Sequence, residues 1–158
     1  MDKLQVVPAT EALIRRMAPN LRQDDLNELQ AHGYTDPLIP LLMGLHGEVQ
    51  ECVIDEAGEP VVAWGIGKSH MEGVGFVWLM ATNEIETHKT EFIRRCRGLL
   101  PGAFEKFHTL TNFVDVRNTL HIRWLRWMGF TFFPKRKLYG SDTQDFYEIV
   151  RIDTCVHQ

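Results

Sequence analysis

The stretch Val74–Ala81, VGFVWLMA, constrains the fold more than any other part of the sequence. It is a continuous apolar run with β-branched and aromatic members, which is typical of a strand buried on both faces. Such a strand needs a neighbour on each side and further layers above and below it. The sequence therefore predicts a central strand here, inside a sheet that is covered on both faces.

The flanking segments predict the rest of the sheet and its helices. Val49–Ile54 and Pro60–Gly67 are joined by a short polar turn containing Gly58, which predicts a hairpin. Further strands are predicted at Leu4–Val7, at Leu110–Val116 and in the closing segments FTFF and DFYEIVRI. Helices are predicted to begin near Thr10, Asp24, Thr87 and Asn118, residues that can cap a first turn. In the apolar segment Pro37–Leu45, PLIPLLMGL, the two prolines argue against one regular helix.

The resulting order is one strand, two helices, three strands, a helix, a strand, a helix and two strands. Most neighbouring strands follow one another directly, and a helix crosses over from the central strand to the next. We therefore expect a single domain over residues 1–158 of mixed α/β (α+β) class. Its central sheet should be mostly antiparallel, with helices on both faces.

Composition excludes several classes of protein. Seventeen Lys and Arg against 21 Asp and Glu give a formal charge of -4, which argues against a nucleic-acid-binding surface. The sequence has no apolar run of about 18 residues, so we expect neither secretion nor a membrane span. Cys52, Cys96 and Cys155 are few and widely spaced, as in a reduced, cytoplasmic protein. His70 with Glu72, and His88 with Glu91, each lack a third ligand, so no metal site is expected.

The stretch from Asn118 to Phe130, NTLHIRWLRWMGF, holds the most informative polar residues. Helical spacing places Asn118, His121 and Leu125 on one face, and Leu120, Trp124, Trp127 and Met128 on another that we expect to be core. Asn118 can cap the helix or contact a ligand. His121 is either a surface histidine or a group that exchanges a proton near neutral pH.

This stretch and the order of elements resemble the GNAT superfamily of acetyl-CoA-dependent N-acetyltransferases. The closing helix of that family commonly carries Asn, then Tyr seven residues on, then Gly-Phe four residues further, and Asn118, Gly129 and Phe130 hold this register. More loosely, the chain resembles GNAT-like proteins of short-tailed bacteriophages, which implies the host cytoplasm as its location. The resemblance implies transfer of an acetyl group from acetyl-CoA to an amine of a protein or small molecule.

The resemblance also assigns candidate residues and exposes two departures. The pantetheine arm would add to the backbone of Leu79, Met80 and Ala81, with Asn118 alongside, and Glu84 and His121 would serve as base and acid. Leu125 stands where the family places its acidic Tyr, and a leucine cannot donate a proton. The stretch TNEIETHKTEF lacks the glycines of the usual pyrophosphate loop, which leaves Thr87, His88 and Lys89 at a helix N-terminus as possible phosphate donors.

Two functions therefore stay open. The first is an N-acetyltransferase with acetyl-CoA as cosubstrate. The second is a binding protein that kept the fold, weakened its chemistry and acts on a host protein, with Pro37–Leu45 as its contact surface.

Overall fold

The computed structural model describes residues 3–96, 98–138 and 144–153. One sheet runs in the order β1-β2-β3-β4-β5-β8-β6, and β7 also pairs with β8. The strands are β1 (Gln5–Pro8), β2 (Val49–Ile54), β3 (Pro60–Lys68), β4 (Val74–Ala81), β5 (Thr109–Asp115), β6 (Thr131–Phe132), β7 (Arg136–Lys137) and β8 (Asp145–Ile152). The helices are α1 (Glu11–Met17), the 3-10 helix η1 (Ala18–Asn20), α2 (Gln23–Ala31), α3 (Leu38–Gly44), α4 (Ile85–Cys96), α5 (Leu100–Ala103) and α6 (Thr119–Trp127).

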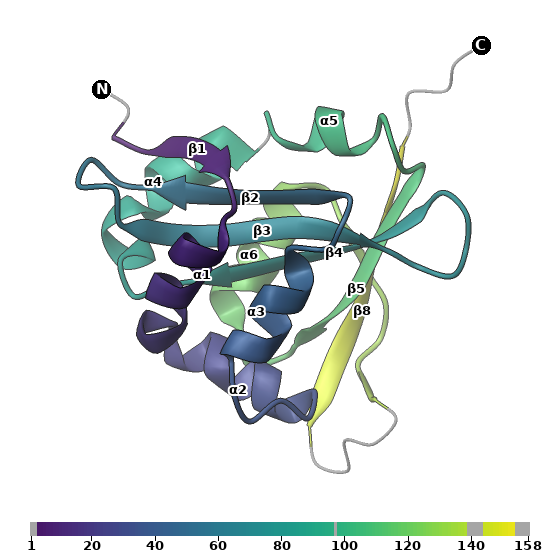
Figure 1. The fold of residues 1–158 in the computed structure, drawn as a ribbon. Helices are drawn as coiled ribbons and strands as arrows, with labels where there is room; N and C mark the ends of the chain where they lie inside the picture. Colours follow the sequence, from purple (N-terminus) through teal and green to yellow (C-terminus); the bar gives the residue numbers. More distant parts are fainter. Residues whose placement is uncertain (1–2, 97, 139–143, 154–158) are drawn as a thin grey trace.

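Helices cover both faces of this sheet. In Figure 1, α1 and α3 lie in front of the sheet, and α4 and α6 lie behind it. Successive side chains of β4 divide between the layers, because neighbouring residues of a strand point to opposite faces. Leu79 and Ala81 join the core that contains α4 and α6, whereas Trp78 and Met80 pack against the core of α1 and α3. The predicted central strand and the mixed α/β, mostly antiparallel fold are confirmed.

The helix predictions were confirmed in part. α1 begins after Thr10, whose hydroxyl accepts a hydrogen bond from the Leu13 N–H. The prediction that Pro37–Leu45 does not form one regular helix is wrong, because Leu38–Gly44 form the regular helix α3. Pro37 is its N-cap and Pro40 lies in its first turn, where a backbone N–H has no partner within the helix in any case. α4 begins at Ile85, two residues before the cap that the sequence suggested at Thr87.

The predicted core face of the last helix also needs one correction. Trp124 and Met128 are buried, but Trp127 is 46% exposed. The Asn118 side chain makes no capping hydrogen bond, although the residue occupies the N-cap position of α6. His121 is buried, so the reading as a surface histidine is wrong. The face that carries Asn118, His121 and Leu125 is therefore as deeply buried as the expected core face.

Cys52 and Cys96 are buried free thiols, and burial raises the pKa of Cys52 to about 11 and that of Cys96 to about 12. Cys155 lies outside the described residues. No helix in the described part of the chain has the length and apolar character needed to cross a membrane.

Candidate functional site

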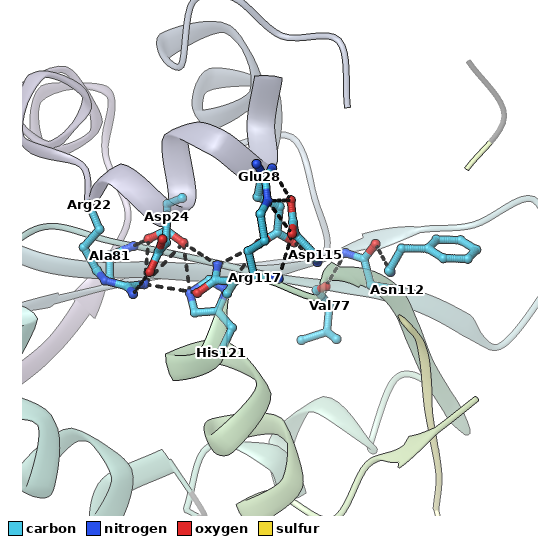
Figure 2. Close-up of polar contacts among 12 residues, drawn as sticks. Arg22, Asp24, Glu28, Val77, Ala81, Asn112, Asp115, Arg117 and His121 are labelled. Atoms are coloured by element: carbon cyan, nitrogen blue, oxygen red, sulfur yellow. Dashed lines mark hydrogen bonds and ion pairs between the residues drawn. The ribbon is translucent and has the colours of Figure 1, made fainter. Parts of the chain in front are cut away.

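The strands β4 and β5 separate in the middle of the sheet. They pair in parallel only from Val74–Phe76 to Thr109–Thr111, and beyond these residues no pairing between them is found in the described chain. We call the gap between Val77–Ala81 and Asn112–Asp115 the β4–β5 opening. Its narrow end is closed by Asn112, whose side-chain amide donates to the Val77 carbonyl at 2.6 Å (Figure 2). The sequence motif alone could not show this separation, because it depends on how two strands diverge in space.

Backbone groups of alternate β4 residues face the opening. The partners of a strand alternate between its two edges, and the Val77 carbonyl and the Ala81 N–H both point away from β3. The same alternation directs the N–H and C=O of Leu79 into the opening and those of Met80 toward β3. Of the three residues predicted to meet a cofactor, Leu79 and Ala81 thus have suitably directed backbone groups.

Two carboxylates of α2 bridge the wide end of the opening. Asp25 Oδ2 accepts a hydrogen bond from the Ala81 N–H at 2.9 Å, and Glu28 Oε1 accepts one from the Asp115 N–H at 3.3 Å. The Arg22 N–H, immediately before α2, donates to the Ala81 carbonyl at 3.0 Å. Figure 2 shows Arg22 beside Ala81 and Glu28 beside Asp115. One short helix therefore ties the diverging ends of β4 and β5 together.

The start of α6 supplies the other half of this arrangement. The turn after β5 is held by Asp115, whose carboxylate accepts a hydrogen bond from the Arg117 N–H at 2.9 Å. It places Asn118 so that its Nδ2 donates to Asp25 Oδ1 at 3.0 Å and to Glu28 Oε2 at 2.7 Å. One turn later, His121 Nε2 lies 3.2 Å from Asp25 Oδ1. We call Arg22, Asp25, Glu28, Asn118 and His121 the polar cluster, and all five are buried.

Burial controls the protonation of this cluster. It raises the pKa of Glu28 to about 8, and the negative charges of Asp25 and Asp115 act in the same direction, although the hydrogen bond from Asn118 opposes them. Burial also lowers the pKa of His121, against the opposing effect of Asp25. Burial therefore favours the protonated form of Glu28 and the uncharged form of His121 at neutral pH. Arg22 lies between two carboxylates, 3.3 Å from Asp24 and 3.5 Å from Asp25.

Free space at the opening is unevenly distributed. A cavity of about 300 Å³ lies at the opening, lined by Glu28 and Tyr34 from the α2 side, by Trp78 and Phe113, and by His121, Trp124 and Leu125 of α6. On the side of α4 and α6 the space is about 10 Å³. The rings of Phe92 and Trp124, which are stacked with centroids 6.3 Å apart, line that side.

The remaining predicted site residues lie where α4 begins. The amides of Ile85, Glu86 and Thr87 donate to the carbonyls of Thr82, Asn83 and Glu84, at 3.1, 3.2 and 3.2 Å respectively. The Thr87 hydroxyl also donates to the Glu84 carbonyl, and Lys89 Nζ pairs with Glu86 at 2.9 Å. Glu84 is exposed and His88 is half-buried. None of these four residues, Glu84, Thr87, His88 and Lys89, has a contact with the polar cluster among those found in the described chain.

Sequence reasoning singled out Asn118 and His121 but missed Arg22, Asp25 and Glu28. These three charged residues recur every third position, and the apolar Leu29 directly follows Glu28, so all four lie on the inward face of α2. A signal was therefore present in their spacing. It was outweighed by the usual rule that charged residues lie at the surface.

Several solved structures of similar fold are acetyltransferases. A GNAT-family acetyltransferase from Bacillus anthracis superposes with a TM-score of 0.71 over 95% of each chain at 14% identity. A GCN5-related N-acetyltransferase from Kribbella flavida gives 0.69 at 14% identity, over 95% of this chain and 98% of that one. Ribosomal-protein-S5-alanine acetyltransferase from Vibrio fischeri gives 0.66 at 14% identity, over 98% and 96%. At this identity the likeness concerns the fold, and it confirms the expected GNAT fold.

No curated protein matches the chain in sequence. The sequence model of one family, described as "Bacteriophage T7, probable scaffold protein Gp13", matches residues 51–135, from within β2 to the residue before β7. This segment is more than half of the chain, contains β4, β5 and α6, and agrees with the resemblance to phage proteins. The chain thus belongs to the bacteriophage T7 Gp13 family and carries a GNAT fold.

Proposed function

We propose that this chain is a binding protein of bacteriophage assembly. In this role its GNAT fold presents a protein-binding surface and does not catalyse acetyl transfer. The main observation in support is that Asp25 and Glu28 accept hydrogen bonds from the backbone amides of Ala81 and Asp115, at the wide end of the β4–β5 opening. The family description as a probable scaffold protein supports the same reading. Three features of the structure argue that acetyl-CoA, the cosubstrate implied by the fold, does not fit.

The first feature is the edge of β4. A pantetheine arm that adds to this strand needs free backbone donors and acceptors. The Ala81 N–H already donates to Asp25, and the Ala81 carbonyl already accepts from Arg22. Displacing them would leave the buried Asp25 carboxylate and the backbone N–H of Arg22 without these partners, which is costly. Among Leu79, Met80 and Ala81, only Leu79 has backbone groups that are directed into the opening and are not engaged by Asp25 or Arg22.

The second feature is the start of α4, where the GNAT superfamily binds pyrophosphate. A helix N-terminus attracts anions through amides that lack partners. Here the amides of Ile85, Glu86 and Thr87 donate to the carbonyls of the preceding turn. The ammonium of Lys89 is paired with Glu86, whose carboxylate would repel a phosphate. This end of the helix is therefore a poor anion site.

The third feature is the tight packing between α4 and α6. Phe92 and Trp124 stack there, and the pocket that they line holds about 10 Å³. Leu125, which stands where the GNAT superfamily has its proton-donating Tyr, is buried and has no proton to donate. Entry of a cofactor arm would require these rings to leave the core.

A contact surface for a partner protein lies on α3. Ile39 is 52% exposed and Met43 is 57% exposed, although both belong to an apolar helix. A groove of about 350 Å³ beside them is lined by Met43, Phe76 and Trp78, among others. Exposed apolar surface of this kind is typical of protein contacts. We assign this face to a structural protein of the phage particle, while a host protein is the other candidate partner.

A second function, N-acetyl transfer, is favoured by one observation, which is that β4 and β5 diverge at all. In that case an amine of a protein or small molecule would enter the cavity of about 300 Å³. Glu84 and His121 would be the base and the acid, with acetyl-CoA along Leu79 and Asn118. This reading requires α2 to release Ala81.

Calorimetric titration with acetyl-CoA separates the two functions. The binding role predicts no heat of binding up to millimolar acetyl-CoA, and co-sedimentation of the protein with assembly intermediates of a T7-like phage. Saturable binding of one acetyl-CoA, with thiol release over a panel of amines, would establish the transferase instead. Failure to co-sediment with any assembly intermediate would remove the role in assembly.

A further inference from the structure

Three side chains of the polar cluster form a set of metal-binding groups. Asp25, Glu28 and His121 each present one possible ligand atom, and these atoms all lie within 4.8 Å of one another. Two carboxylates and an imidazole are common ligands of zinc and of related divalent transition metals. Neither the proposed binding role nor the resemblance to acetyltransferases assigns a purpose to this set.

His121 supplies an independent indication that a ligand belongs here. Its Nε2 is buried and has no hydrogen-bond partner in the part of the chain that the structure describes. The atom lies 3.2 Å from Asp25 Oδ1, in an orientation that does not form a hydrogen bond. A buried ring nitrogen without a partner is unusual, because desolvation without a compensating bond is costly. An ion bound by this nitrogen and the carboxylate would remove that cost.

The spacing between His121 and Asp25 suits a small tetrahedral ion. Bonds of about 2.0–2.1 Å to nitrogen and oxygen place two ligands of a tetrahedral zinc ion about 3.3 Å apart. The separation between His121 Nε2 and Asp25 Oδ1 is 3.2 Å. Asn118 holds the two carboxylates in position, because its Nδ2 donates to an oxygen of each. The cavity of about 300 Å³, which both Glu28 and His121 line, provides a route from solvent.

We propose that Asp25, Glu28 and His121 bind a divalent transition-metal ion of the zinc class between α2 and α6. Glu28 releases its proton when the ion binds, so that two carboxylates balance the double charge of the ion, and His121 binds in its neutral form. The positive charge of Arg22, whose guanidinium lies 3.5 Å from Asp25, would repel the ion. The same guanidinium also pairs with the more exposed Asp24 at 3.3 Å, so Asp25 is not its only partner. The bound ion would hold the wide end of the β4–β5 opening closed, since it joins one ligand from α6 to two from α2.

The test uses the whole chain, freed of metal with EDTA and then dialysed. Zn²⁺ is titrated by calorimetry, Co²⁺ is followed through its visible absorption bands, and the melting temperature is measured with and without one equivalent of Zn²⁺. We expect one ion per chain, Co²⁺ bands typical of fewer than six ligands, and a higher melting temperature with metal, because the ion binds the folded state. Mg²⁺ should bind at least tenfold more weakly, since it prefers oxygen ligands and octahedral geometry.

Matched variants locate the site. His121→Ala should weaken Zn²⁺ binding at least tenfold, whereas His70→Ala, which removes an exposed histidine, should leave it unchanged. If His121→Ala does not fold by circular dichroism, Glu28→Gln removes a ligand with little change of shape and should give the same loss. No binding at millimolar Zn²⁺, or undiminished binding in the variant that folds, would overturn the proposal. Neither result depends on whether the chain binds acetyl-CoA or a phage protein.

Discussion

Asp24 and Asp25 offer a matched comparison of an exposed and a buried carboxylate. Both lie in the first turn of α2, where each interacts favourably with the helix dipole, and both contact Arg22. The Asp24 side chain is 43% exposed, whereas that of Asp25 is fully buried. The substitutions Asp24→Ala and Asp25→Ala therefore remove the same chemical group and differ in its surroundings.

The two losses should differ severalfold. Asp25→Ala leaves the Ala81 N–H without an acceptor, removes one of the two acceptors of the Asn118 amide and leaves the buried Arg22 without its inner partner. Breaking a buried pair of this kind costs about 3–5 kcal/mol. Asp24→Ala removes one half-exposed contact to the same guanidinium, for which a loss below about 1 kcal/mol is expected.

Urea denaturation in EDTA, followed by far-UV circular dichroism, measures both free energies of unfolding. EDTA keeps a bound metal ion from adding to the effect of Asp25. We expect Asp25→Ala to be less stable than Asp24→Ala by at least about 2 kcal/mol, given the ranges above. If the two variants agree within about 1 kcal/mol, the bridging of β4 and β5 by α2 does not stabilise the protein as argued.

Further predictions concern pH, thiols and packing. Glu28 keeps a proton in the folded state up to a pKa of about 8, but in the unfolded chain only to about its ordinary value of 4.5, so stability falls as pH rises between these values. In EDTA, urea titrations should show the free energy of unfolding of the wild type falling by roughly 3 kcal/mol relative to that of Glu28→Gln between pH 4.5 and pH 7. If the stability of both proteins depends on pH in the same way, Glu28 is not protonated as argued. Because Cys52 and Cys96 are buried with raised pKa values, a thiol reagent should label at most one of the three cysteines until urea unfolds the chain. Gly65→Ala should lower the free energy of unfolding by about 3 kcal/mol or more, because its Cβ would lie 2.3 Å from a backbone carbonyl oxygen of β2. Gly67→Ala should change it by less than about 1 kcal/mol, because nothing lies within 4 Å of its Cβ. Equal thermal unfolding of the two variants would refute this packing.

Local patterns predicted the elements whose residues carry a strong periodic signal. The apolar run Val74–Ala81 and the cap at Thr10 are such cases, since both depend on neighbours within a few residues. Pro40 misled the prediction, because its effect depends on whether it falls in the first turn of a helix or later. That position follows from where α3 begins, which the composition of the segment did not fix.

The polar cluster could not be predicted for a different reason. Asn118 lies 93 positions from Asp25 and 90 from Glu28 in the sequence, yet its amide binds both carboxylates. In a short polar helix such as α2, charged residues normally face water, and only these distant partners reverse that preference. The Asn118 motif located one half of the site, and the other half required the tertiary fold.

The position of α2 relative to the matched family segment has a consequence for access to the gap. The separated strands and the start of α6 lie within residues 51–135, while Asp25 and Glu28 come from a helix upstream of it. The gap and the helix that closes it thus come from different parts of the chain and meet through Asn118, which donates to both carboxylates. Access to the gap is therefore set by residues outside the β-sheet, so replacing these two carboxylates would change it without rebuilding the sheet.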